Sequence, residues 1–202
     1  MQTLFSINAD NLIEKLNPIT QERWEVWTKR RGGAHEDTRC IPLKWSANKR
    51  DFEPNETNEY NQIEYHEEYL LFANELDDIN RTLDSIHGPA KLINAVFIKL
   101  LAGCGVREHQ DVPTGRENIF SKTRRYHIPI ITNPKVYMKC LDTDYYLEKG
   151  NVYELENTKN HGVRNESELD RIHLVIDRLP SVSYTHLRAH ETPEHRGWRG
   201  GG

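Results

Sequence analysis

The sequence predicts a mainly β fold with helices confined to its N-terminal part. From residue 91 onward, short segments rich in β-branched and aromatic residues alternate with turn residues at regular spacing. These segments span residues 91–103, 125–131, 135–141, 151–157 and 170–177. The helical spacing of apolar residues, by contrast, occurs before residue 90. Short strands at regular spacing indicate a sandwich or barrel, and two sheets that close on each other would form a jelly roll.

The first expected elements are a short helix and a strand. The segment INADNLIEKLN, residues 7–17, has the apolar spacing of an amphipathic helix, with Asn8 or Asp10 as its cap. The segment TRCIPLKW, residues 38–45, has the composition of a strand.

A polar loop and one long helix are expected next. The proline-containing segment SANKRDFEPNETN, residues 46–58, predicts the loop. Residues 59–86 then keep a roughly helical spacing of apolar side chains, which predicts a single long helix. The tripeptide His87-Gly88-Pro89 ends it.

The β-rich region follows this helix. Gly103 and Gly105 close its first strand. Further turns are expected at residues 133–134, 150–151 and 160–165.

Two of the expected strands carry an arginine and a histidine on the face opposite their apolar residues. The strand RYHIPII sets Tyr126, Ile128 and Ile130 on one face, and Arg125 and His127 on the other. Inner strands of a sandwich or barrel have no face fully exposed to water. The pattern therefore indicates a polar interior, which is typical of a site for a charged ligand.

The strand RIHLVID repeats this arrangement. Ile172, Leu174 and Ile176 share one face, while Arg171 and His173 share the other. We expect His173 itself to be structural.

Composition narrows the classes of function. The 202-residue chain carries a net charge of −4 with acids and bases interspersed, unlike the basic stripe of a nucleic-acid-binding protein. No apolar run reaches the roughly 20 residues of a membrane span, and the N-terminus lacks the features of a signal peptide. Cys40, Cys104 and Cys140 are odd in number and widely spaced, which favours a reduced, cytoplasmic protein.

We expect one domain, residues 1–180, with a helical and loop part at 1–90 and a jelly-roll core at 91–180. From residue 181 apolar periodicity stops, and Arg, His and Gly accumulate. Residues 181–202 resemble translated sequencing-adapter read-through and are expected to be a disordered, non-native tail. A genuine disordered tail is the alternative.

A candidate metal centre follows from the spacing of histidines and acids. Two histidines and one carboxylate on one octahedral face form the ligand set of non-haem iron(II) oxygenases. His109 and Asp111 form an H-x-D motif after the glycine-closed strand. His161, in an expected turn, is the third candidate. Arg171, on a strand ten residues further on, is a candidate clamp for a carboxylate.

A second H-x-D motif, His35-Glu36-Asp37, is expected to be a chance match. It lies before a strand rather than after one, and no further histidine and arginine pair accompanies it. It could still line a substrate loop.

Each candidate residue has a structural alternative. His109 and Asp111 could form a hydrogen-bonded pair in a turn, and His161 could be a turn residue. His127 could be a core histidine with satisfied hydrogen bonds, and Arg171 could be a surface cation. Arg124 competes with Arg125 for the inward position, because neighbours on a strand point to opposite faces.

The segments REHQD, RRYHIPI, GNVYELENTKNHGVRN and DRIHLVID together resemble a known family. Between about residues 93 and 177 the chain is similar to the aspartyl/asparaginyl β-hydroxylases. These are 2-oxoglutarate-dependent oxygenases, and some of them hydroxylate free proline. The resemblance implies a double-stranded β-helix, which is a cupin-like jelly roll.

The resemblance also implies the cofactors and the metal ligands. Iron(II) would bind His109, Asp111 and His161, and 2-oxoglutarate would be the cosubstrate. Some animal members of the family lack the acidic ligand. Since Asp111 is present, this chain resembles the branch with a full triad, and the free-proline hydroxylases in its ligand spacing.

Three further roles follow from the resemblance. Arg171 would bind the distal carboxylate of 2-oxoglutarate, while Arg125 and His127 would contact the cosubstrate near the metal. The first 90 residues match the family loosely, and we expect them to determine substrate choice.

The expected function is hydroxylation of an amino-acid residue or a free amino acid of the Asp, Asn or Pro type, with ascorbate as an auxiliary reductant. The expected partner is a small-molecule or peptide substrate, without nucleic acid or membrane, and the oligomeric state stays open. One alternative is a non-catalytic, cupin-like protein that binds a small acid. Another is a metal-dependent hydrolase or isomerase, although a hydrolase has no need of a dicarboxylate clamp.

Overall fold

A computed structural model describes residues 1–27, 33–46, 63–112 and 119–181. The helices are α1 (Ala9–Leu16), α2 (Gln21–Val26) and α3 (Tyr69–His87), with 3-10 turns η1 (Gly33–His35) and η2 (Ile119–Ser121). The first strands are β1 (Thr3–Ser6), β2 (Thr38–Ser46), β3 (Ile63–Tyr65), β4 (Ala90–Leu100), β5 (Gly105–His109) and β6 (Arg124–Ile131). The remaining strands are β7 (Val136–Cys140), β8 (Thr143–Tyr145), β9 (Asn151–Leu155), β10 (His161–Asn165) and β11 (Arg171–Pro180).

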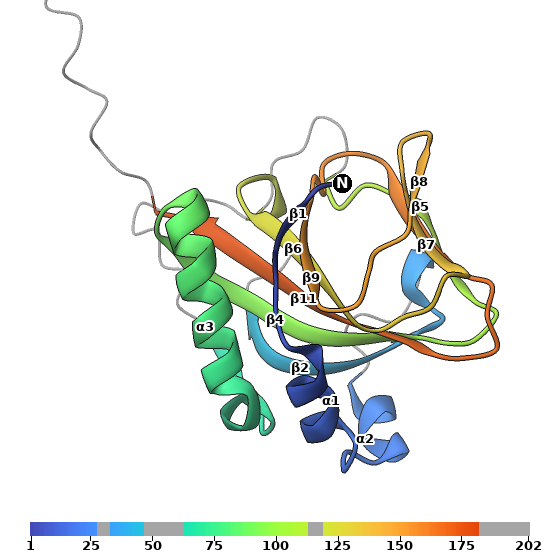
Figure 1. Ribbon diagram of the computed structural model, residues 1–202, viewed down its shortest axis with the longest axis horizontal. Coiled ribbons are helices and arrows are strands. Elements are labelled where there is room, and N and C mark those ends of the chain that lie inside the picture. The colour runs from blue at the N-terminus through green and yellow to red at the C-terminus, as the bar shows by residue number, and fades with distance from the viewer. Residues whose placement is uncertain (28–32, 47–62, 113–118, 182–202) are drawn as a thin grey trace, which may run out of the picture.

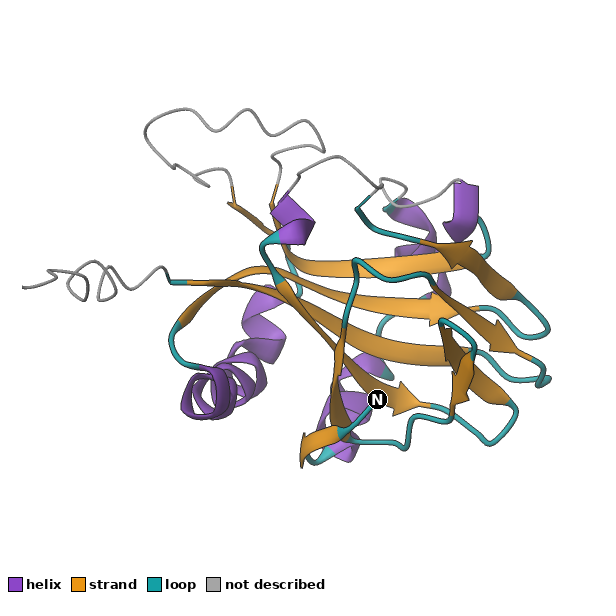
Figure 2. Ribbon diagram, turned by 90° about the horizontal axis from the view of Figure 1, so that it is seen from above, coloured by secondary structure: helices purple, strands orange, loops and turns teal. Residues whose placement is uncertain are grey.

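The strands form two antiparallel sheets that face each other as a jelly roll. The larger sheet has the order β1-β9-β6-β11-β4-β2-β3, and the smaller has the order β5-β10-β7-β8. Figure 1 shows the smaller sheet on one side of the larger sheet and helices α1, α2 and α3 on the other. Seen from above, strands make up most of the molecule (Figure 2). The predicted jelly roll is therefore confirmed.

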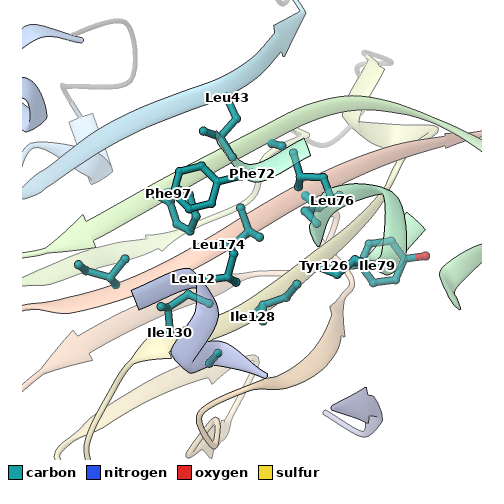
Figure 3. Close-up of a cluster of buried hydrophobic side chains, with 14 of the residues drawn as sticks. Leu12, Leu43, Phe72, Leu76, Ile79, Phe97, Tyr126, Ile128, Ile130 and Leu174 are labelled. Carbon is teal, nitrogen blue, oxygen red and sulfur yellow. The ribbon is translucent and has the colours of Figure 1, made fainter. Parts of the chain in front are cut away.

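The main hydrophobic core lies between the larger sheet and the helices. Sheet residues such as Ile128 and Leu174 meet Leu12 of α1 and Phe72 and Leu76 of α3, and all five are almost fully buried. Figure 3 shows these side chains in contact across the sheet–helix boundary. Because the apolar faces of β6 and β11 point to the helices, their Arg/His faces must point to the smaller sheet.

A second core fills the space between the two sheets. It contains Leu100 and Leu155 of the larger sheet and Val106, Met138 and Val163 of the smaller sheet. The polar side chains of β6 and β11 share this interior, as the sequence pattern predicts.

Most predicted elements are confirmed within a few residues. Helix α1 is capped by Asn8, whose side chain accepts a hydrogen bond from the backbone N–H of Asp10 at 3.0 Å. The five predicted strands after residue 90 correspond to β4, β6, β7, β9 and β11.

The single long helix predicted over residues 59–86 is wrong at its N-terminal end. Residues Ile63–Tyr65 instead form β3, which pairs with β2, and helix α3 begins only at Tyr69. Edge pairing with β2 satisfies the backbone of this segment, so tertiary contact overrides its weak helical spacing. Ser46 belongs to β2, and the rest of the predicted 46–58 loop lies outside the described residues.

The turn predicted at residues 160–165 is also wrong. His161–Asn165 form β10, the strand between β5 and β7 in the smaller sheet. Only Val163 in this segment is strongly apolar, so its pairing with two neighbours leaves little local signal. The predicted tail, residues 181–202, lies outside the described residues beyond Ser181.

Candidate metal centre

The smaller sheet places two of the predicted metal ligands directly opposite each other. His109 ends β5 and His161 begins β10, and the two residues are partners in the antiparallel ladder. Their ring centroids lie 4.6 Å apart. Gly162 permits this close approach, because a Cβ atom there would lie 2.9 Å from the carbonyl oxygen of Val106.

The third predicted ligand, Asp111, lies two residues beyond β5. Its backbone N–H donates to the carbonyl of Asn157 at 3.1 Å, which turns the chain toward the interior. Its carboxylate oxygens lie 3.5 Å from Nε2 of His109 and 4.0 Å from Nε2 of His161. The structure thus places all three predicted ligands next to one another. Their ligand atoms lie further apart than they would if each were bound to one metal ion at about 2.0–2.2 Å.

Both histidines are held in the tautomer that a metal ligand needs. Nδ1 of His109 contacts the carbonyl oxygen of Arg107 at 2.7 Å, and Nδ1 of His161 contacts that of Lys159 at 2.8 Å. A carbonyl only accepts hydrogen bonds, so each Nδ1 carries a proton, and in the neutral ring Nε2 then offers its lone pair. Nε2 of His109 is buried and makes no hydrogen bond among the described residues. Burial lowers the pKa of His161, although the charge of Asp111 acts to raise it. The lowered pKa favours the neutral ring.

Arg125 connects Asp111 to the larger sheet. Its Nε and Nη2 donate to the two carboxylate oxygens of Asp177 at 2.7 and 3.0 Å, and its Nη1 donates to Oδ2 of Asp111. Burial works to lower the pKa of Arg125, but the charges of Asp111 and Asp177 outweigh it and raise the pKa. Arg125 therefore stays charged and fixes the orientation of Asp111. The neighbouring Arg124 points outward to Glu154.

The carboxylate of Asp177 is itself anchored in the sheet. Nδ2 of Asn94 donates to it at 2.9 Å, and Oδ1 of Asn94 accepts the backbone N–H of Ser46 at 2.8 Å. A buried polar chain therefore runs from β2 through Asn94, Asp177 and Arg125 to Asp111. Such a chain, with each member bonded, stabilises one geometry of the centre.

Arg171 and His173 lie further along β11 in the interior. Arg171 is 3% exposed and His173 is 1% exposed. Both line a crevice against the smaller sheet that is too small to hold a water molecule, together with Thr132, Val136, Met138, Leu147 and Val163. Val163 is two residues beyond His161 on β10, so this crevice adjoins the metal centre.

The hydrogen bond between Arg171 and His173 leaves one buried donor available. Nη2 of Arg171 lies 2.6 Å from Nδ1 of His173, and a guanidinium only donates, so Nδ1 must be the acceptor. The proton of the neutral ring then sits on Nε2, which is buried and has no hydrogen-bond partner within the described chain. Burial and the charge of Arg171 lower the pKa of His173 well below its ordinary value. A guanidinium and a buried N–H donor side by side fit an anionic ligand.

His127 lies between these two groups of residues. It is buried, it pairs with Val175 on β11, and its ring centroid is 5.9 Å from that of His173. Arg125 is its neighbour two positions earlier on the same face. The predicted site residues of β6 therefore share one interior with those of β11.

Four residues of this interior were not predicted to belong to a site, and one of them is His173, which was expected to be structural. Asp177 continues the alternation of Arg171 and His173 along β11, so the period-two pattern could have indicated it. Asn94 carries no such signal, because the other residues between positions 92 and 98 of its strand are all apolar. His35, in the motif predicted to be a chance match, lies beside His109 with ring centroids 4.7 Å apart.

Comparisons with known proteins assign the chain to a family. A model of the aspartyl/asparaginyl beta-hydroxylase family matches residues 49–180, so the chain belongs to this family. The match begins well before residue 93, where the sequence resemblance starts. Family membership supports an oxygenase activity. A search of curated proteins finds no match.

Two solved structures share the fold over most of the chain. One, described as a non-heme monooxygenase, ThoJ, in complex with nickel, is 14% identical with a TM-score of 0.53 and covers 89% of this chain and 72% of its own. The other, an oxidoreductase of the 2OG-Fe(II) oxygenase family from Burkholderia pseudomallei, is 12% identical with a TM-score of 0.50. It covers 70% of this chain and 67% of its own. None of the helices that the structure describes is long and apolar enough to cross a membrane.

Proposed function

We propose that this protein is an iron(II)- and 2-oxoglutarate-dependent oxygenase that hydroxylates an amino-acid residue or a free amino acid of the Asp, Asn or Pro type. The observation that carries the proposal is the convergence of His109, His161 and Asp111, with both Nε2 atoms in the deprotonated tautomer. Family membership supports the same chemistry.

His109, Asp111 and His161 would hold the metal by two imidazole nitrogens and one carboxylate oxygen. This is the ligand set of the non-haem iron(II) oxygenases. When bound, iron(II) with 2-oxoglutarate and dioxygen supplies the oxidising chemistry, in which 2-oxoglutarate becomes succinate and carbon dioxide while one oxygen atom enters a substrate C–H bond. Arg125 orients Asp111, because its guanidinium pairs with that carboxylate in a buried position.

Arg171 and His173 would bind the distal carboxylate of 2-oxoglutarate. The guanidinium supplies charge-assisted donors and His173 Nε2–H supplies a further donor, all in a crevice from which water is largely excluded. Val163 of β10, two residues beyond His161, lines this crevice, so a short dicarboxylate bound there would extend from Arg171 toward the metal centre once the crevice widens to admit it. Arg125 and His127 would line the path between them.

The direct test is succinate formation by the purified protein with iron(II), 2-oxoglutarate, dioxygen and ascorbate. A panel of free amino acids and Asp-, Asn- or Pro-containing peptides is added, and products are examined for a mass gain of one oxygen atom. We expect succinate formation that requires iron(II) and is lost in Asp111→Ala. A protein that binds 2-oxoglutarate but never converts it, with any member of the panel, would instead be a small-acid-binding protein.

A further inference from the structure

A third histidine reaches the metal centre from a distant part of the chain. His35, His109 and Asp111 each offer one potential ligand atom, and these three atoms lie within 4.8 Å of one another. The rings of His35 and His109 meet edge to face, with an interplanar angle of 86°. His35 is half-buried and lies 74 residues before His109, so only the fold brings the two together.

The turn that carries His35 is fixed on the strand that carries His109. The carbonyl of Gly33 accepts a hydrogen bond from Nη2 of Arg107 on β5 at 2.6 Å. The carbonyl of His35 accepts one from the hydroxyl of Thr38 at 2.7 Å, at the start of β2. These two backbone contacts fix the turn between β5 and β2. The position of His35 beside the centre is therefore determined by these strands.

His35 together with the proposed triad would offer the metal four protein ligands. An iron(II) oxygenase with a facial triad uses three during turnover. Six positions surround an octahedral metal, and three protein ligands leave three positions open. A bidentate chelator such as 2-oxoglutarate and one dioxygen molecule fill those three positions. A permanent fourth protein ligand would leave only two, so His35 and the full set of reactants cannot be bound at the same time.

We propose that His35 is a fourth, displaceable protein ligand, which binds the divalent metal until 2-oxoglutarate chelates it. This inference rests on the proposed function for the identity of the displacing molecule, while the role of His35 as a ligand depends only on metal binding. Until 2-oxoglutarate binds, this arrangement lowers the number of metal positions open to other molecules from three to two.

The test measures metal affinity and cosubstrate affinity separately, without turnover. Co(II) is titrated into wild type, His35→Ala and His35→Gln against a chelating indicator, and 2-oxoglutarate is then titrated into each Co(II)-loaded protein. His66→Ala is the matched control, since His66 is also a half-buried histidine but lies beside Glu64, away from the centre. Thermal melting of each metal-free variant checks that it is folded.

We expect His35→Ala to weaken Co(II) binding about tenfold or more, in line with losses for groups that support a metal site. By linkage, its affinity for 2-oxoglutarate should rise by the same factor, because no protein ligand has to leave. His35→Gln should fall between wild type and His35→Ala, and His66→Ala should match wild type.

Two results would overturn the inference and leave the proposed function standing. Unchanged Co(II) affinity in His35→Ala would show that His35 is not a ligand. Weakened Co(II) binding without a gain in 2-oxoglutarate affinity would show that the ligand is not displaced. Failure of wild-type protein to bind Co(II) would overturn both proposals, whereas Co(II) binding without 2-oxoglutarate binding would overturn the proposed function and the displacement.

Discussion

The guanidinium of Arg125 lies between the carboxylates of Asp111 and Asp177 and donates hydrogen bonds to both. One of these carboxylates belongs to the candidate metal centre and the other to the middle of the larger sheet. The geometry of the centre is therefore tied to the sheet through a single buried cation. A metal ligand held in this way is oriented before any metal arrives.

Replacement of Arg125 by Met should lower the free energy of unfolding by about 3–5 kcal/mol, because it leaves two buried carboxylates without their cation. Urea unfolding of the metal-free protein measures this loss. Arg124→Met is the matched control. Arg124 is 43% exposed in its pair with Glu154, and such a surface pair contributes at most about 1 kcal/mol. Equal losses in the two variants would contradict the bridging role of Arg125.

Arg171→Lys should weaken 2-oxoglutarate binding about tenfold to a hundredfold, since a charge-assisted hydrogen bond contributes about 1.5–3 kcal/mol and Lys lacks the guanidinium fork. Anaerobic calorimetric titration of the iron(II)-loaded protein measures the affinity. Iron(II) binding itself should stay nearly unchanged. Arg164→Lys, on the exposed side of β10, serves as the control. If Arg171→Lys binds 2-oxoglutarate as tightly as wild type, the cosubstrate assignment is wrong.

Stability should fall on acidification in a way that depends on His173. Burial first, and then the charges of Arg171 and His127, lower its pKa in the folded protein. The unfolded chain therefore takes up this proton first as the pH falls below about 6.5. The free energy of unfolding should decrease there by up to about 1.4 kcal/mol per pH unit from this residue. Urea unfolding between pH 7.5 and about 5 should show a shallower slope for metal-free His173→Gln than for wild type; identical slopes would count against a neutral, buried His173.

Gly162→Ala should damage the metal centre more than the fold. The added Cβ would meet the carbonyl of Val106, which forces β10 away from β5 where His161 faces His109. We expect metal affinity to fall about tenfold or more. Gly105→Ala is the control. Its added Cβ would lie 3.0 Å from a carbonyl oxygen on the same pair of strands, but at the end away from His109 and His161. Similar metal affinities in the two variants would show that the close approach at Gly162 does not set the ligand geometry.

The sequence predicts the strands of this fold well where one face is apolar. The alternation in β6 and β11 indicates both the strand and the face turned to the helices, because burial of one face imposes a period of two. Sequence-based prediction fails for β10, because its pairing with neighbours in the smaller sheet is not indicated by its own residues. It also fails for β3, which depends on the edge of β2.

For the candidate site, local motifs indicated the metal ligands but not their supports. His109 and Asp111 lie in one short motif, and His161 was a candidate from its place before Arg171, which the family resemblance supported. Asp177 continues the alternation of Arg171 and His173 on β11, but local sequence does not show that it pairs with Arg125, and the H-x-D motif of His35 does not show that its turn lies beside His109. The position of His35 in particular depends on contacts of its turn with β5, which no local pattern encodes.

The most direct test of the central claim is an anaerobic titration of the iron(II)-loaded protein with 2-oxoglutarate, followed by visible absorption. Chelation of iron(II) by the keto acid produces a charge-transfer band that neither component shows alone. We expect this band to appear and saturate in wild type and to be absent in Asp111→Ala, which should still fold because Arg125 keeps its pair with Asp177. A wild-type protein that binds iron(II) tightly at this centre but develops no band with 2-oxoglutarate would contradict the account.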